Sequence, residues 1–157
     1  MEHLHQNTED ASPHVALPEF ELFRNFDKIT LKQILSTGHF YNIDDNEKLF
    51  NDSRSSSDAF VVLEGTLFTY TKSDLRLTFQ NGDCINPGFL HCPKMSSPDI
   101  IAEGVAKVLC YKRSEILNFF REQPEKLFKL FTMNVIQCQQ KMIINLISKP
   151  GSNLGKE

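Results

Sequence analysis

The stretch that most constrains the fold is "FVVLEGTLFTY", which runs from Phe60 to Tyr70. Both of its halves have the β-branched and aromatic composition that is typical of strands, and Glu64-Gly65 separates them. Glycine adopts the positive φ of a tight turn without steric cost. The pair therefore predicts a corner between two antiparallel strands.

Further short strands are predicted on both sides of this stretch. "LRLTF" (Leu75–Phe79) alternates apolar and polar residues, and the turn sequences Lys72–Asp74 and Asn81–Asp83 flank it. The other predicted strands are two in "HFYNIDDNEKLFND", then Ile100–Ala102 and Val105–Tyr111, with a bend near Gly104. Several short strands at regular spacing predict a closed antiparallel β-barrel or jelly roll (double-stranded β-helix), because closure hides the strand edges.

Helices are predicted before and after the strands. "LPEFELFRNFDKITLKQILSTG" predicts a short helix after Pro18 and a second helix over Thr30–Ser36. After Lys112 the apolar period becomes helical. Ser114 is expected to cap "EILNFFREQ", and Pro124 to begin a long helix that ends at "KPG". The fold class is therefore mainly β with flanking helices, namely short N-terminal helices and a long C-terminal helix.

The long helix is apolar on more than one side. One apolar row consists of Leu127, Phe131, Val135, Cys138, Met142 and Leu146, and a second set consists of Leu130, Met133, Ile136, Ile143 and Ile147. One side can pack on the β body, and the other side needs a partner. We expect a homodimer or a protein partner through helix 124–148; the alternative is a single helix folded across its own domain.

Composition favours one soluble domain. The chain has 157 residues, 40% of them hydrophobic and 24% charged, with a net charge of −3, which gives no sign of a nucleic-acid-binding protein. We expect a disordered arm over 1–17, one domain over 18–148 and a flexible tail over 149–157. Because there is no secretory signal and no apolar run of membrane-spanning length, we expect a cytoplasmic protein without a membrane span.

The four cysteines do not form a Cys-x-x-Cys pair. They are Cys84, Cys92, Cys110 and Cys138, and each lies in an apolar setting. This pattern predicts reduced, mostly buried thiols rather than a metal site or a disulfide framework.

The order of the elements resembles the cyclic nucleotide-binding domain family, which includes catabolite activator protein-like regulators. The resemblance covers about Phe20 to Ile147. "FELFRNFDKITLKQIL" resembles the opening of the family, "DAFVVLEGTLFTY" places Gly65 at its hairpin glycine, and "FQNGDCI" places Gly82-Asp83 at its Gly-Asp. The resemblance implies a regulatory β-barrel domain that binds a cyclic nucleotide after that Gly-Asp.

The segment that should hold the cyclic phosphate departs from the family. It reads "GDCINPGFLHCPKMSSPDIIAEG", with no acidic residue near Asn86–Gly88 and no arginine near Ser96. Its prolines also remove backbone N–H donors that a phosphate needs. The candidate ligand-binding residues are Gly82, Asp83, Asn86, Gly88, Lys94, Ser96 and Ser97. We expect a degenerate ligand site that does not bind cyclic nucleotides in the usual manner.

These observations predict a non-catalytic regulatory or interaction module. The alternative is a small-ligand sensor that binds a cyclic nucleotide or another small molecule in the barrel. No catalytic motif, metal-ligand pattern or cofactor motif is found, so we expect no enzyme activity, no metal and no cofactor. Only "SKPGSNLGKE" follows the long helix, so we expect no DNA binding through a helix-turn-helix.

Overall fold

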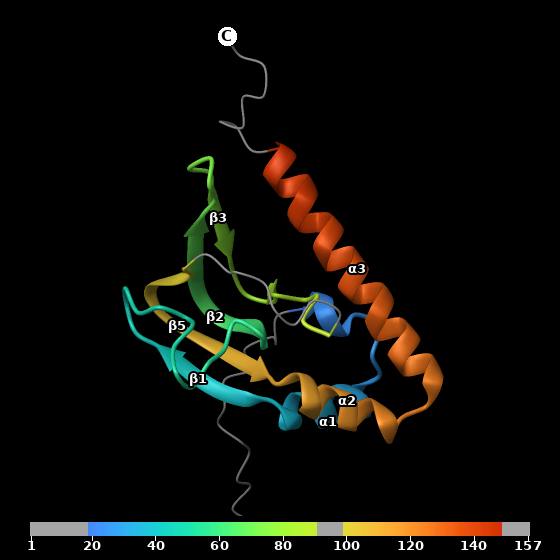
Figure 1. Ribbon diagram of the computed structural model, residues 1–157. Coiled ribbons are helices and arrows are strands. Elements are labelled where there is room, and N and C mark those ends of the chain that lie inside the picture. Colours follow the sequence, from blue (N-terminus) through green and yellow to red (C-terminus); the bar gives the residue numbers. More distant parts are fainter. Residues whose placement is uncertain (1–18, 91–98, 149–157) are drawn as a thin grey trace, which may run out of the picture.

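The computed structural model describes residues 19–90 and 99–148. Within these ranges the chain forms an antiparallel sheet with helices along one side and at one end (Figure 1). The elements in chain order are η1 (Glu21–Phe23), α1 (Lys28–Thr37), β1 (His39–Ile43), β2 (Ala59–Tyr70), β3 (Arg76–Phe79), β4 (Cys84–Ile85), β5 (Ile101–Tyr111), α2 (Arg113–Arg121) and α3 (Glu125–Ser148). The predicted fold class, mainly antiparallel sheet with short helices first and a long helix last, is confirmed at this level.

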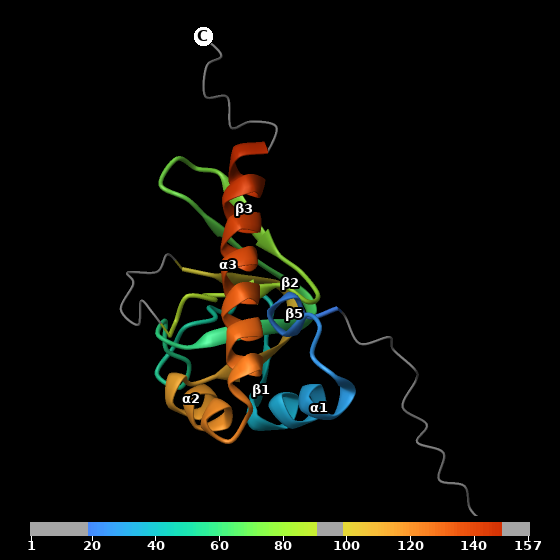
Figure 2. The same ribbon diagram turned by 90° about the vertical axis from the view of Figure 1, so that its right-hand side faces the viewer.

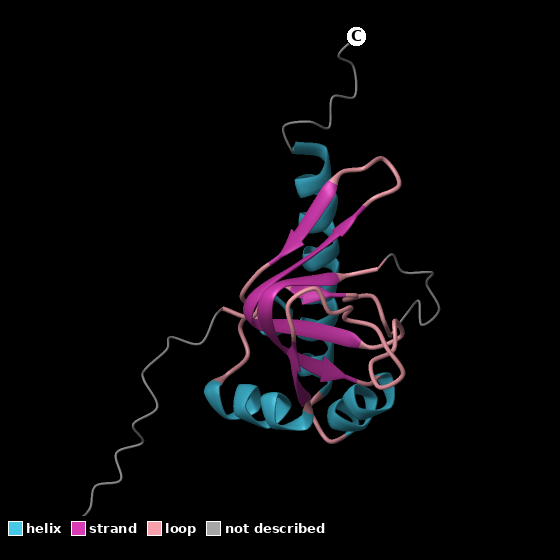
Figure 3. Ribbon diagram, turned by 90° about the vertical axis from the view of Figure 1, so that its left-hand side faces the viewer, coloured by secondary structure: helices cyan, strands magenta, loops and turns pink. Residues whose placement is uncertain are grey.

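The sheet is open in the part of the chain that the structure describes. Its strand order is β1-β5-β2-β3. The short strand β4 also pairs with β2, at Phe60 and Val61, whereas β3 pairs with the later part of β2. The predicted closed barrel is therefore wrong for these residues, although β2 and β5 are strongly curved (Figure 3). One reason is that the second strand predicted after the turn at Asp44 is reduced to a single bridge between Lys48 and Ile101.

The predicted corner at Glu64-Gly65 is wrong, because β2 runs through it as one strand. Gly65 has φ +91, and the register between β2 and β5 shifts on both sides of Glu64. A positive φ suits a bulge as well as a turn, and a bulge bends the strand without ending it. The two strands predicted on either side of Gly104 are likewise one strand, β5, with Gly104 at φ +73.

Alternation along β2 divides the core into two parts. Ala59 and Val61 pack with the helices, whereas Phe60 and Val62 pack inside the curve of the sheet. This follows from the period of two in a strand, whose successive side chains point to opposite faces. All four residues are fully buried.

The helices begin where the local sequence allows. Asp27 caps α1, because its Oδ1 accepts a hydrogen bond from the Thr30 N–H at 2.8 Å. The predicted cap at Ser114 is wrong: the carbonyl of Lys112 already accepts the Glu115 N–H at 3.1 Å, so α2 begins one residue before Ser114. As predicted, α3 begins directly after Pro124; it starts beside α2 and passes in front of the sheet in the view of Figure 2.

Candidate functional site

The predicted Gly82-Asp83 pair forms the turn between β3 and β4. Gly82 has φ +87, and its N–H donates to the carbonyl of Val62 at 2.7 Å. The Asp83 carboxylate accepts the N–H of Gln80 at 2.8 Å. Burial, reinforced by the neighbouring carboxylate of Glu21, raises the pKa of Asp83. Both residues thus hold the turn in place, and Asp83 in addition faces α3, with its Oδ1 4.0 Å from the Nζ of Lys141.

Asn86 and Gly88 lie in the segment after β4. The Asn86 amide donates to the carbonyls of Ser56 and Asp58, both at 2.9 Å. Gly88 lies against α3, because a Cβ placed on it would meet the Nε2 of Gln139 at 2.6 Å. In the first half of the predicted ligand segment, Asn86 and Gly88 are therefore engaged in contacts within the protein. The other three predicted residues, Lys94, Ser96 and Ser97, lie outside the described residues.

The arginine nearest in sequence after this segment is already engaged. Arg113, the first residue of α2, donates from Nε to the carbonyl of Leu90 at 3.2 Å. Phe89 is fully buried in the core that the helices share with the sheet. The sequence analysis assigned no role in this segment to Arg113 or Phe89. Only the apolar character of "GFL" in the sequence indicates that the segment packs inward.

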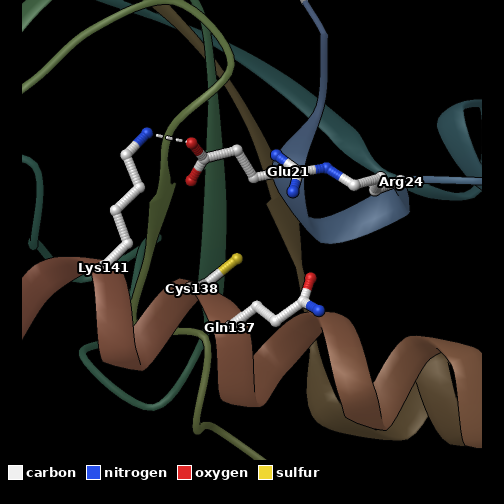
Figure 4. Close-up of a pocket in the computed structure, with 5 residues that line it drawn as sticks. All are labelled: Glu21, Arg24, Gln137, Cys138 and Lys141. Carbon is white, nitrogen blue, oxygen red and sulfur yellow. Dashed lines mark hydrogen bonds and ion pairs between the residues drawn. The ribbon is translucent and has the colours of Figure 1, made fainter.

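A pocket that the sequence analysis missed lies between η1 and α3 (Figure 4). Its volume is about 170 Å³, and its lining residues are Glu21, Arg24, Gln137, Cys138 and Lys141. These residues come from two ends of the chain, so no local motif could have brought them together. The Lys141 ammonium forms an ion pair with Glu21, and this hydrogen bond raises the pKa of Lys141.

The floor of this pocket is a neutral thiol. Cys138 is 5% exposed, and burial raises the pKa of its thiol to about 11. The predicted burial of the cysteines is confirmed for Cys84, Cys110 and Cys138, which are free thiols, whereas Cys92 lies outside the described residues. Among residues 19–90 and 99–148, no three His, Cys, Asp or Glu side chains are arranged to hold a metal ion.

The outer face of α3 is apolar and exposed to solvent. Its exposed large residues are Met133, Ile136, Ile143, Ile144 and Ile147, of which Ile147 is 65% exposed. On the inner face, Phe131, Val135 and Cys138 are buried against the sheet and η1. The prediction that α3 has one apolar side packed on the body and a second apolar side facing outward is therefore confirmed. No helix in the described ranges has both the length and the apolar content needed to cross a membrane.

No protein-family model and no curated protein matches this chain by sequence. Solved structures resemble it at low identity. A cyclic nucleotide-binding domain from Methylobacillus flagellatus matches with a TM-score of 0.69 and 13% identity, over 85% of this chain and 78% of that chain. The N-terminal domain of a transcriptional regulator from Streptomyces coelicolor A3(2) matches with a TM-score of 0.63 and 14% identity, over 84% and 94% of the two chains.

A third match is the catabolite activator protein of Thermus thermophilus, with a TM-score of 0.62 and 15% identity. The match covers 80% of this chain and 59% of that protein. Together these likenesses show that the chain has the fold of a cyclic nucleotide-binding domain. At such identities they concern the fold and not the ligand.

Proposed function

We propose that this protein is a non-catalytic regulatory module that pairs with a second copy of itself through the outer face of α3. The observation that carries the proposal is the row of exposed apolar side chains on that helix. A large apolar patch that the protein leaves in contact with water is typical of an interaction surface.

The spacing of this row suits a helix partner. Met133, Ile136, Ile143 and Ile147 follow the alternating three- and four-residue steps of a coiled-coil seam, and Gln140 occupies the step between Ile136 and Ile143. The seam from 133 to 147 is roughly 21 Å long at 1.5 Å per residue. It faces away from the sheet, since the residues that pack on the body lie on the other side of the helix.

The charge of this surface favours a second copy over a charged partner. Between Phe131 and Ile147 the only charged residue is Lys141, which forms its ion pair with Glu21 on the inner side. Gln140 lies at the middle of the seam, and an amide both donates and accepts hydrogen bonds, so two copies of Gln140 can bond to each other. Between Met133 and Ile147, no charged side chain on this face would repel its own copy.

The lysines near the start of α3 set a limit to the contact. Lys126 and Lys129 continue the same seam toward the N-terminus of the helix. In a parallel pair the like charges would face each other and repel. In a parallel pair the two helices would therefore diverge before Met133, which would leave room for the body of each copy.

The ligand segment supports a module that does not hold a cyclic nucleotide in the usual manner. The Asn86 amide and the Asp83 carboxylate are already bonded to the backbone of the protein. The flanking arginine, Arg113, donates to Leu90. A phosphate needs a cation and free N–H groups, and residues 82–90 provide neither a cation nor a free Asn86 amide.

Sedimentation velocity at micromolar concentration tests the pairing. We expect the wild type to sediment as a dimer and the variants Ile136→Glu and Ile143→Glu as monomers, because each variant buries two carboxylates in an apolar seam. Each substitution is expected to weaken the dimer at least about a hundredfold, which corresponds to about 2.8 kcal/mol.

Ile29→Glu is the matched control, since Ile29 is 72% exposed on α1 and lies off the seam. We expect this variant to remain a dimer. A monomeric wild type, or a dimer that both seam variants leave intact, would contradict the proposed self-association.

A further inference from the structure

The pocket between η1 and α3 has the features of a small-molecule site outside the sheet. Its walls are Glu21 and Arg24 from η1 and its C-cap, and Gln137, Cys138 and Lys141 from little more than one turn of α3 (Figure 4). The volume of about 170 Å³ is ample for several waters or for a small organic molecule.

The wall that carries Arg24 is held rigidly. The side chain of Asn134 on α3 is 2% exposed, and its Nδ2 donates to the carbonyls of Leu22 at 3.1 Å and Arg24 at 2.9 Å. The N–H of Glu21 also donates to the carbonyl of Gly82 at 3.4 Å. The backbone that bears the guanidinium is thus fixed relative to α3 before any ligand arrives, which lowers the entropic cost of binding.

The two cations of the pocket differ in what they already bind. Lys141 is shared by the carboxylates of Glu21 and Asp83. Arg24 has one ion pair among the described residues, a 3.9 Å contact between its Nε and the carboxylate of Glu19, which is 82% exposed. Such an exposed, long ion pair contributes little free energy and does little to hold the guanidinium. The guanidinium therefore keeps a planar set of donors directed at the pocket.

Gln137 provides a second donor beside Arg24. Figure 4 places its amide on the same side of the pocket as the guanidinium, and within the described ranges that amide makes no hydrogen bond to protein. Cys138 lies between this pair and Lys141, as a neutral, weakly polar surface. The pocket thus combines a forked cation, an amide donor and a neutral thiol floor, and its remaining wall is the Glu21 carboxylate in its ion pair with Lys141.

We propose that this pocket binds a small monocarboxylate, with the carboxylate on the Arg24 guanidinium and the Gln137 amide and the apolar part over Cys138. A planar carboxylate fits the fork of an arginine through two parallel hydrogen bonds. Because Arg24 follows η1 and Gln137 belongs to α3, the bound molecule joins the N-terminal segment to the long helix. The proposal does not depend on self-association, since none of the seam residues lines the pocket.

Butyrate and butyramide form a matched pair of probes, because they have the same shape and only butyrate has the charge. Each is titrated into the protein at constant ionic strength, and ¹H–¹⁵N spectra are recorded for the Arg24 Nε–H and the Gln137 side-chain amide. We expect saturable shifts of both signals with butyrate and none with butyramide. Equal shifts with the two probes would overturn the proposal. The absence of any shift when butyrate is in 100-fold excess over millimolar protein would also overturn it.

Variants locate the binding. Arg24→Gln is expected to raise the butyrate dissociation constant at least about tenfold, Gln137→Ala to raise it severalfold, and Arg24→Lys to give an intermediate value because a lysine keeps the charge without the fork. Arg121→Gln removes an exposed arginine of α2 and is expected to leave binding unchanged. Unchanged affinity in Arg24→Gln would overturn the assignment. The same titration with Ile143→Glu separates this site from the self-association of α3, since we expect binding to persist in that variant.

Discussion

The ammonium of Lys141 in α3 donates a hydrogen bond to the carboxylate of Glu21 in η1, 120 residues earlier in the chain. The same Nζ lies 4.0 Å from Asp83 in the turn between β3 and β4. One lysine therefore links three segments: the N-terminal segment, the turn predicted to flank a ligand, and the long helix. This arrangement leads to the first prediction.

Lys141→Met is expected to lower the free energy of unfolding at pH 7 by about 1 kcal/mol or less, since the lysine side chain is 53% exposed. The pKa of Lys141 is raised above its ordinary value of 10.5, first by the bond to Glu21. A raised lysine pKa stabilises the fold below pH 10.5 and loses this effect as the pH rises through the folded pKa. Urea unfolding of both proteins from pH 7 to pH 11 checks this.

The control for Lys141 is Lys107→Met, because Lys107 pairs with Glu64 at 3.5 Å on an exposed surface of the sheet, away from α3. We expect no measurable change in that variant. A loss in Lys107→Met as large as in Lys141→Met would show that the contact of Lys141 with η1 adds no more stability than an ordinary surface ion pair.

Asp83→Asn is expected to stabilise the protein slightly at pH 7. Burial raises the pKa of Asp83 in the folded state, so its charged form costs stability as the pH rises through that pKa. Asparagine carries no charge, and its oxygen still accepts the Gln80 N–H. The advantage of the variant should shrink as the pH falls toward 4, where the wild-type carboxyl is also becoming neutral.

Asp27→Asn is the comparison of opposite sign. The pKa of Asp27 is lowered, first by the hydrogen bond from the Thr30 N–H, so its charged form stabilises α1. This variant should lose stability at pH 7 and match the wild type at low pH. Denaturation curves in which both aspartate variants move in the same direction with pH would refute this account of the two carboxylates.

Gly65→Ala is expected to destabilise the protein by about 3 kcal/mol. Gly65 has φ +91, and a Cβ there would lie 2.6 Å from the carbonyl oxygen of Val105 and 2.9 Å from the Cα of Ala106. Both are backbone atoms, which cannot move without opening the pairing of β2 with β5. Thermal or urea unfolding measures the loss.

Gly104→Ala separates the clash from the backbone strain. Gly104 has φ +73, but nothing lies within 4 Å of a Cβ placed on it. Its substitution should cost only the strain of a left-handed residue, about 1–2 kcal/mol. Equal losses at the two positions would mean that the close approach at Gly65 does not matter.

The contrast between these glycines explains where the sequence was informative about the fold. Alternation in "LRLTF" correctly predicted β3, and Pro124 correctly predicted the start of α3, because both signals are local. Gly65 was interpreted wrongly because a positive φ serves a hairpin turn and a bulge equally well. Only the pairing of β2 with β5 decides between them, and that pairing is not local.

The candidate site was less predictable for the same reason. The two faces of α3 could be deduced from the period of its apolar residues, and the turn at Gly82-Asp83 could be deduced from its composition. The contact of Lys141 with Glu21 and the pocket with Arg24 and Gln137 join opposite ends of the chain. Similarly, nothing in the polar run Ser53–Asp58 indicates that Arg54 is 5% exposed and donates to Leu49 and Glu47.

Cyclic AMP and cyclic GMP at millimolar concentration are expected to leave the melting temperature unchanged. The segment after Gly82-Asp83 contains no arginine, and Asn86 and Arg113 already bond to the protein. A ligand at 100 times its dissociation constant would stabilise the fold by about 2.7 kcal/mol, which is a shift of several degrees. A saturable shift with either nucleotide would establish a ligand-binding sensor and contradict the degenerate site.

Cross-linking at the centre of α3 tests the central proposal most directly. Gln140 lies midway between Met133 and Ile147, so it meets its own copy whether the two helices are parallel or antiparallel. Under mild oxidation the variant Gln140→Cys should form a disulfide-linked dimer almost completely, while Asn118→Cys, at an exposed position on α2, should not. Equal and slight cross-linking of the two variants would contradict self-association through the outer face of α3.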